Sequence, residues 1–243
     1  MIPHSKPKEF RYNGHLRPLG CARLAHRTNS IGHRQWLRVG KRTDSGPTGR
    51  SQSLPGRWCS TSTSVMEPQP PDPTWPRYST RPFPSYRFLP GNNPHPRRDP
   101  LGHSYGQPEP TPAAFPSEVW RQSEDYLYGI DLYNFAYWWE CHEVFEGLWH
   151  AVGHDTEQGN FFQALIQIAA AHLKRFIGNE QAARKLARSG LARLQNLPLL
   201  YMGVDVVALS DSCRAFSTPL SKSTPFQIRL AFKTPPSSES IKS

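Results

Sequence analysis

Residues 137–149 read YWWECHEVFEGLW, and this stretch indicates an amphipathic helix. At about 100° per residue, its apolar side chains fall on one continuous arc of a helical wheel. That arc holds Tyr137, Trp138, Cys141, Val144, Phe145, Leu148, Trp149 and Val152. His142 and Glu146 are four residues apart and stack along the edge of the arc. Glu143 borders the solvent-facing side, and Glu140 lies opposite the arc.

The segments on either side of this stretch also carry helical patterns. The expected helices cover about residues 117–130, 132–152, 155–177, 180–195 and 203–216, and a short strand is expected over 226–232. Ser117 and Asn179 are suited to cap the first and fourth helices, and Gly153 to end the second. Short connections make successive helices antiparallel neighbours. The sequence therefore predicts an all-α fold, a small antiparallel bundle of about four to five helices.

The chain divides by composition into a bundle, two preceding segments and a tail. Residues 66–116 contain 15 prolines in 51 positions, which predicts an extended N-terminal arm whose aromatic side chains pack on a neighbouring surface. Residues 1–65 are basic and lack helical or strand periodicity. We expect translation to start at Met66; the alternatives for this segment are a disordered basic arm or a targeting sequence. The helical bundle should cover residues 117–216, and residues 217–243 should form an irregular tail.

Charge and cysteine content exclude several classes of protein. Residues 1–65 hold 12 basic and two acidic residues, whereas residues 66–243 hold 17 of each. The chain from residue 66 onward is therefore neutral and is not expected to bind nucleic acid. The sequence lacks the run of about 18 apolar residues that a membrane helix needs, so we expect no membrane association. Four cysteines without a CxxC pair are typical of reduced thiols in the cytoplasm.

His172 falls inside the apolar arc of the helix expected over residues 155–177. A buried imidazole needs a partner, and the nearest candidates on the preceding helix are His142 and Glu146. In one interpretation these three residues bind a divalent zinc, manganese or iron ion, with Glu143 as a fourth ligand or as the general base. In a second interpretation a His–Glu pair performs acid–base catalysis without a metal. In a third, a buried His–carboxylate hydrogen bond only joins two helices.

Other polar side chains are accessory candidates at most. His95, Asp99 and His103 recur at four-residue spacing in the arm, where exposed turns are the simpler interpretation. Gln163 and Gln167 lie one turn apart and either orient a ligand or form a wet helix face. For His150 and His154, near a helix end, we expect capping or solvent contact rather than metal ligation.

The runs DLYNFAYWWECHEVFEGLW and NFFQALIQIAAAHLKRFIGN resemble the domain-of-unknown-function family 309 over about residues 117–200. The positions that match its pattern are Tyr137, His142, Glu143, Glu146, Trp149, Gln163 and Gln167. The resemblance implies an all-helical bundle and the general label of a metal-dependent hydrolase. It implies no particular substrate.

Two functions from different classes follow. The first is hydrolysis of an unknown small molecule, with His142, Glu146 and His172 holding the ion and Glu143 activating water. The second is a non-enzymatic binding or homo-oligomerisation module with a purely structural His–Glu pair, in which Trp138 and Trp149 dock a partner or a second copy.

Overall fold

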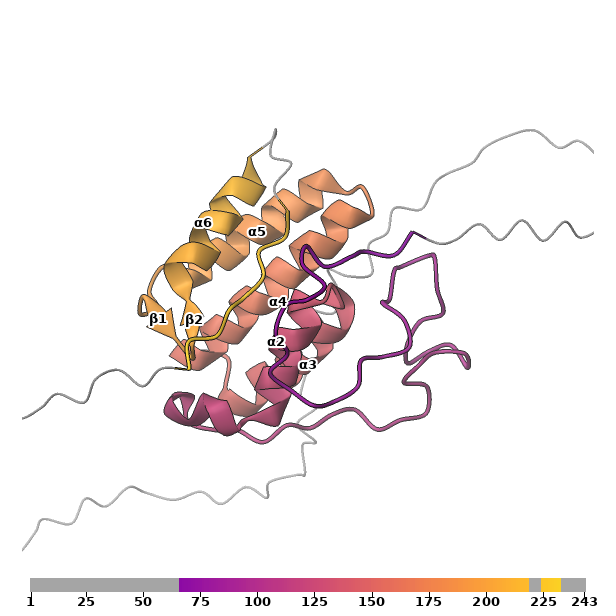
Figure 1. Cartoon of the computed structure of the whole chain (residues 1–243), viewed down its shortest axis with the longest axis horizontal. Coiled ribbons are helices and arrows are strands. Elements are labelled where there is room, and N and C mark those ends of the chain that lie inside the picture. Colours follow the sequence, from indigo (N-terminus) through magenta and orange to yellow (C-terminus); the bar gives the residue numbers. More distant parts are fainter. Residues whose placement is uncertain (1–65, 219–223, 233–243) are drawn as a thin grey trace, which may run out of the picture. The chain divides into compact units, whose positions relative to one another are not determined.

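Five α-helices follow a short 3₁₀ helix in this computed structural model, which describes residues 66–218 and 224–232 (Figure 1). The helices are η1 (Ser117–Gln122), α2 (Glu124–Asn134), α3 (Trp138–Val152), α4 (Glu157–Phe176), α5 (Glu180–Leu194) and α6 (Val206–Ser217). Strands β1 (Leu200–Tyr201) and β2 (Val204–Asp205) pair antiparallel between α5 and α6. The prediction of an all-α fold is confirmed. The basic segment 1–65 and most of the expected tail lie outside the described residues.

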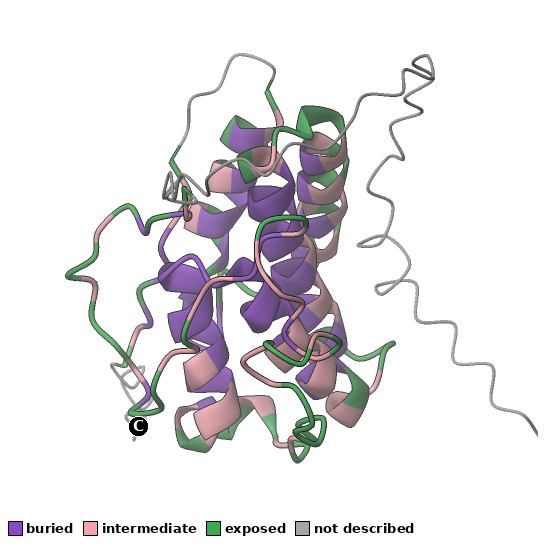
Figure 2. Ribbon diagram, turned by 90° about the vertical axis from the view of Figure 1, so that its right-hand side faces the viewer, coloured by how far each residue is buried: buried purple, intermediate pink, exposed green. Residues whose placement is uncertain are grey.

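Successive helices are also neighbours in space. Helix α3 packs against α2 and α4, and α5 packs against α4 and α6. Their buried faces turn toward one another, whereas the loops outside them are mostly exposed or half-buried (Figure 2). Helices α4 and α5 approach closely at Gly190, where a Cβ atom would lie 2.9 Å from Ile168 Cγ1. This layering buries one side of α3 and fixes the direction in which His142 points.

The start of the bundle differs from the predicted single helix over residues 117–130. Ser123 interrupts it with extended backbone, and its side chain caps α2 by accepting a hydrogen bond from the Tyr126 N–H. Helix α2 then continues to Asn134, and the next helix begins at Trp138 rather than near Leu132. Ala136 separates them with a left-handed φ of 64°. Hydrophobic periodicity does not reveal this break, because the residues on both sides of it are apolar and buried.

The expected strand over residues 226–232 is an extended segment without strand pairing. Asn134 replaces a strand partner, because its side chain accepts from the Ile228 N–H at 2.6 Å and donates to the Ile228 carbonyl at 2.8 Å. The Ala231 N–H donates to the Gly203 carbonyl of the hairpin turn. The described part of the tail is therefore attached to the bundle.

The Pro-rich arm, residues 66–116, contains neither helix nor strand and runs along α2 and α3 (Figure 1). Asp131 of α2 anchors its first part, with carboxylate oxygens that accept from the backbone N–H groups of Tyr78 and Ser79 and from Arg77 Nε. Farther along, a Cβ atom at Gly147 of α3 would lie 3.0 Å from Pro112 Cδ. The arm thus lacks helix and strand, as its proline density predicts, folds into turns over residues 90–106, and covers one side of α3.

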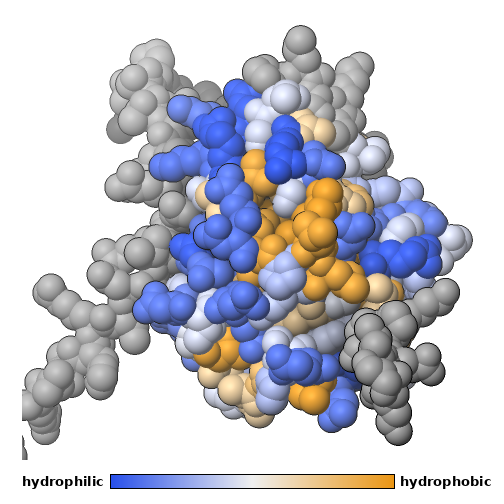
Figure 3. Space-filling model, turned by 90° about the vertical axis from the view of Figure 1, so that its left-hand side faces the viewer, coloured by the Kyte–Doolittle hydropathy of each residue, from blue (hydrophilic) through white to orange (hydrophobic). Residues whose placement is uncertain are grey.

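The surface over α6 and the hairpin is partly apolar (Figure 3). Leu199, Leu200 and Val207 are exposed there and line a groove together with the segment from Phe226 to Ala231. None of the helices in residues 66–218 combines the length and hydrophobicity that crossing a bilayer requires.

Candidate metal centre

Helix α3 carries His142, Glu143 and Glu146, the HExxE spacing from which the sequence predicts a polar cluster. The helix ends at Gly153, whose φ of 92° is readily adopted only by glycine. Phe145 and Leu148 are fully buried, which fixes the rotation of the helix about its axis. His142 therefore points into the protein and is 1% exposed.

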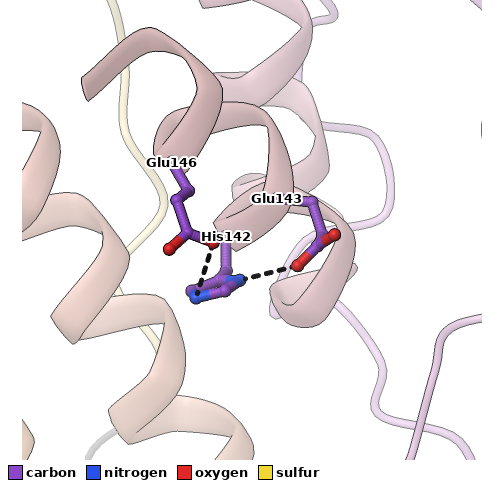
Figure 4. Close-up of side chains that lie close together, drawn as sticks. All are labelled: His142, Glu143 and Glu146. Atoms are coloured by element: carbon purple, nitrogen blue, oxygen red, sulfur yellow. Dashed lines mark ion pairs between the residues drawn. The ribbon is translucent and has the colours of Figure 1, made fainter. Parts of the chain in front are cut away.

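His142, Glu143 and Glu146 converge on one another (Figure 4). His142 Nδ1 lies 3.3 Å from Glu143 Oε1, and Nε2 lies 3.8 Å from Glu146 Oε2. One potential ligand atom from each residue falls within 4.8 Å of the others. The two carboxylates thus face different nitrogens of the same imidazole, and the predicted stacking of His142 and Glu146 is confirmed.

The cluster is buried at the imidazole and partly open at the carboxylates. The side chains of Glu143 and Glu146 are 18% and 15% exposed. Arg97 of the arm reaches over α3, and its Nε lies 3.5 Å from Glu143 Oε2. Glu143 therefore has one carboxylate oxygen near His142 and the other near a guanidinium group.

The arm also changes the environment of Glu140, which the helical wheel places opposite the packing face. Although it lies opposite the apolar arc, Glu140 is only 5% exposed. Its Oε1 accepts from the Phe88 N–H at 2.8 Å and lies 3.2 Å from His103 Nε2. A helical wheel identifies the face of α3 that packs on other helices. It does not reveal that the arm covers the opposite face, where Glu140 lies.

The structure does not bring His172 into the group formed by His142, Glu143 and Glu146. His172 Nε2 lies 3.1 Å from the Tyr133 hydroxyl, and the ring packs against Trp138 and Phe216. Burial, and secondarily the charge of Arg175, lowers the pKa of His172 to about 3. The imidazole is therefore neutral and buried, as the apolar arc predicts, but its partner is a tyrosine.

The arm residues His95, Asp99 and His103 also lie outside this group. His95 packs against Phe88 and Trp139, and its Nδ1 accepts from the Arg97 N–H. Asp99 accepts from the Leu101 N–H within a turn. His103 contacts Glu140, on another side of α3. All three residues shape or attach the arm.

Gln163 and Gln167 are both half-buried on α4. Gln167 lines a polar groove between α4 and α5, together with Asn160 and Arg193. Its Oε1 is buried and accepts no hydrogen bond from the described residues. The groove has no lining residue from α3, so Gln167 does not contribute to the cluster around His142.

Sequence reasoning missed three contributions to this side of the protein. Arg97 carried no signal, because its role depends on the path of the arm over Glu143. Glu140 stands three residues before Glu143, and only the arm buries it. His150 Nδ1 and His154 Nε2 lie 2.8 Å apart, and the position of these exposed histidines at a helix end does not reveal that contact.

Comparison with known proteins gives one family. Residues 126–186 match the sequence pattern described as Domain of unknown function (DUF309). The match begins in α2, includes all of α3 and α4, and ends in the first half of α5. No curated protein matches the chain.

Proposed function

We propose that this chain, whose residues 126–186 match the DUF309 family, is a metal-dependent hydrolase with His142 and Glu146 as ligands. The observation that carries the proposal is the convergence of one imidazole and two carboxylates within 4.8 Å. Nitrogen and carboxylate donors together suit zinc, manganese or iron.

Two features of the site support the fit to a divalent cation. His142 Nε2 and Glu146 Oε2 are 3.8 Å apart on successive turns of one helix, so modest side-chain movement brings both to one ion. Trp138 and Trp149 of the same helix have buried indole N–H groups without an acceptor among the described residues. Buried donors of this kind normally have a partner, which a bound anion or polar substrate would supply.

Glu143 acts through His142 in this proposal rather than as the general base. Its two oxygens lie next to His142 Nδ1 and Arg97 Nε, so the carboxylate is already committed to two cationic or donor groups. A carboxylate at Nδ1 keeps the proton on that nitrogen and leaves the lone pair on Nε2 for a ligand. Arg97 holds the carboxylate in place.

When bound, a divalent ion supplies Lewis-acid polarisation and a water nucleophile at neutral pH. The chain supplies the orientation of His142 and the negative charge of Glu146, whose carboxylate faces Nε2 of His142. Access is narrow, because the imidazole is buried and the two carboxylates are less than one-fifth exposed. The substrate is therefore a small molecule.

The alternative of a binding module that docks through α3 has less support. Trp138 and Trp149 are 5% and 7% exposed, and they pack within the chain against His172 and His154. These indoles are not available to a partner unless α3 separates from its neighbours.

A direct test compares hydrolysis of small chromogenic esters and phosphates with added Zn²⁺, Mn²⁺ or Fe²⁺. The protein is the full chain, purified without a His-tag. Metal-stimulated turnover should disappear in His142→Ala and Glu146→Gln, and fall about 10–100-fold in Glu143→Gln, as for residues that orient a ligand. Glu118→Gln, in the exposed first turn of η1, is the matched control and should retain full activity. Equal turnover in Glu146→Gln and Glu118→Gln would contradict the proposal.

A further inference from the structure

A second pair of imidazoles meets at the end of α3. His150 Nδ1 lies 2.8 Å from His154 Nε2. Both residues are exposed, and neither forms an ion pair with a carboxylate of the described residues. The sequence predicts solvent contact or helix capping for them, and nothing in that prediction brings the two rings together.

The fold fixes this contact from both sides. Gly153 turns the chain with a φ of 92°, so that His154 folds back over the last turn of α3. The His154 ring stacks on Trp149, with centroids 3.9 Å apart and an interplanar angle of 19°. Just beyond, the Thr156 hydroxyl donates to the Gly153 carbonyl and accepts from the Gly159 N–H. The loop that carries His154 is therefore held at both of its ends.

The spacing of the two nitrogens suits a shared metal ion. Imidazole nitrogens bind zinc at about 2.0–2.1 Å, so two such ligands at a right angle lie about 2.9 Å apart. The observed separation is 2.8 Å. Without an ion, one ring donates an N–H hydrogen bond to the other. When His150 carries its proton on Nε2 and His154 on Nδ1, the two facing nitrogens both present lone pairs to an ion. Exposure of both residues leaves the remaining coordination positions to water.

We propose that His150 and His154 form a second, solvent-exposed site for a divalent transition-metal ion. Two neutral imidazoles without a carboxylate favour copper and nickel over zinc, and disfavour magnesium and calcium. The site is independent of the hydrolase proposal, because it uses neither His142 nor Glu146.

Copper and nickel titrations of the untagged full chain test the site, and Trp149 is a built-in reporter. A paramagnetic ion on His154 lies next to this indole, so binding should quench tryptophan fluorescence. For copper, electron paramagnetic resonance should show hyperfine coupling to two nitrogens. His150→Gln and His154→Gln should each weaken this binding at least tenfold, because each removes one of two ligands.

Two further variants separate this site from the others. His142→Gln should retain the quenching, which distinguishes the exposed pair from the inner cluster. Trp149→Phe should keep the two-nitrogen signal and lose part of the quenching. Unchanged copper affinity in both His150→Gln and His154→Gln would overturn the proposal, as would a loss confined to one of the two.

Discussion

At the scale of single residues, His172 shows what burial does to a titratable group. The ring is 4% exposed and lies 3.1 Å from the Tyr133 hydroxyl, and burial together with the nearby charge of Arg175 strongly disfavours its protonated form. The folded-state pKa of about 3 lies well below the usual value of 6.5 for histidine. His172 is therefore neutral in the folded protein and protonated in the unfolded chain at mildly acidic pH.

This difference predicts a pH dependence of stability. The stabilising effect of a neutral His172 is complete above pH 6.5 and is lost progressively as the pH falls toward 3, because the unfolded state then binds more protons. The slope attributable to this residue approaches about 1.4 kcal/mol per pH unit. Urea unfolding between pH 7 and 4.5 should show a steeper loss for the wild-type protein than for His172→Gln. Parallel pH profiles for the two proteins would contradict this explanation.

The residue scale also shows how far the sequence predicts the site. The four-residue spacing of His142 and Glu146 is sufficient to stack them on one side of a helix. The partner of His172 is not predictable in this way, because Tyr133 belongs to another helix. Its position depends on the left-handed residue Ala136, and no local pattern marks an alanine for that conformation.

At the scale of elements, the extended arm depends on α2 for its attachment. Proline density predicts its extended conformation, but the attachment points are tertiary and have no sequence period. Asp131 is fully buried and accepts the backbone N–H groups of Tyr78 and Ser79, both at 2.9 Å. This buried carboxylate is therefore a main anchor for the part of the arm that leads toward α3, beside surface contacts such as Arg81–Asp125.

Replacing Asp131 with asparagine should release the arm. The NH2 group of the new amide would face the N–H donors that the carboxylate oxygen now accepts from. Buried polar groups are then left unpaired, which lowers the free energy of unfolding by about 2–3 kcal/mol. Limited proteolysis should also cut residues 66–116 faster. Asp211→Asn is the matched control, since Asp211 pairs with Arg214 within α6 at the surface, away from the arm, and should change stability by less than about 1 kcal/mol. Equal protease sensitivity of the two variants would argue against this attachment.

At the scale of the whole described molecule, Asn134 joins segments that lie far apart in the sequence. Its side chain pairs with both backbone groups of Ile228, and its carbonyl accepts from Gln227 Nε2. Gln227 also exchanges hydrogen bonds with Asp72 at the start of the arm. Arm, α2 and C-terminal segment should therefore unfold together.

Asn134→Ala tests this coupling. The substitution removes a buried amide and leaves the Ile228 N–H and carbonyl without their partner, so the free energy of unfolding should fall by about 2–4 kcal/mol. Asn196→Ala, at an exposed position after α5, should shift it by less than about 0.5 kcal/mol. Denaturant midpoints from circular dichroism and tryptophan fluorescence would establish both changes. Similar midpoints for the two variants would show that the segment adds little stability.

The bundle as a whole follows from helix periodicity and short connections, and these were sufficient to predict its class. The hairpin β1–β2 was not predicted, because each strand has only two residues and thus no usable alternation. The burial of Glu140 also escaped prediction, since it depends on a segment about 50 residues earlier in the chain.

The central claim is that His142 and Glu146 bind a divalent ion, and calorimetric titration with Mn²⁺ and Zn²⁺ tests it most directly. The untagged full chain should carry His150→Gln and His154→Gln, so that the exposed pair does not contribute. Adding Glu146→Gln to this protein should remove one equivalent of bound metal per chain. The same stoichiometry and affinity with and without Glu146→Gln would contradict the claim and leave the cluster as a structural contact within α3.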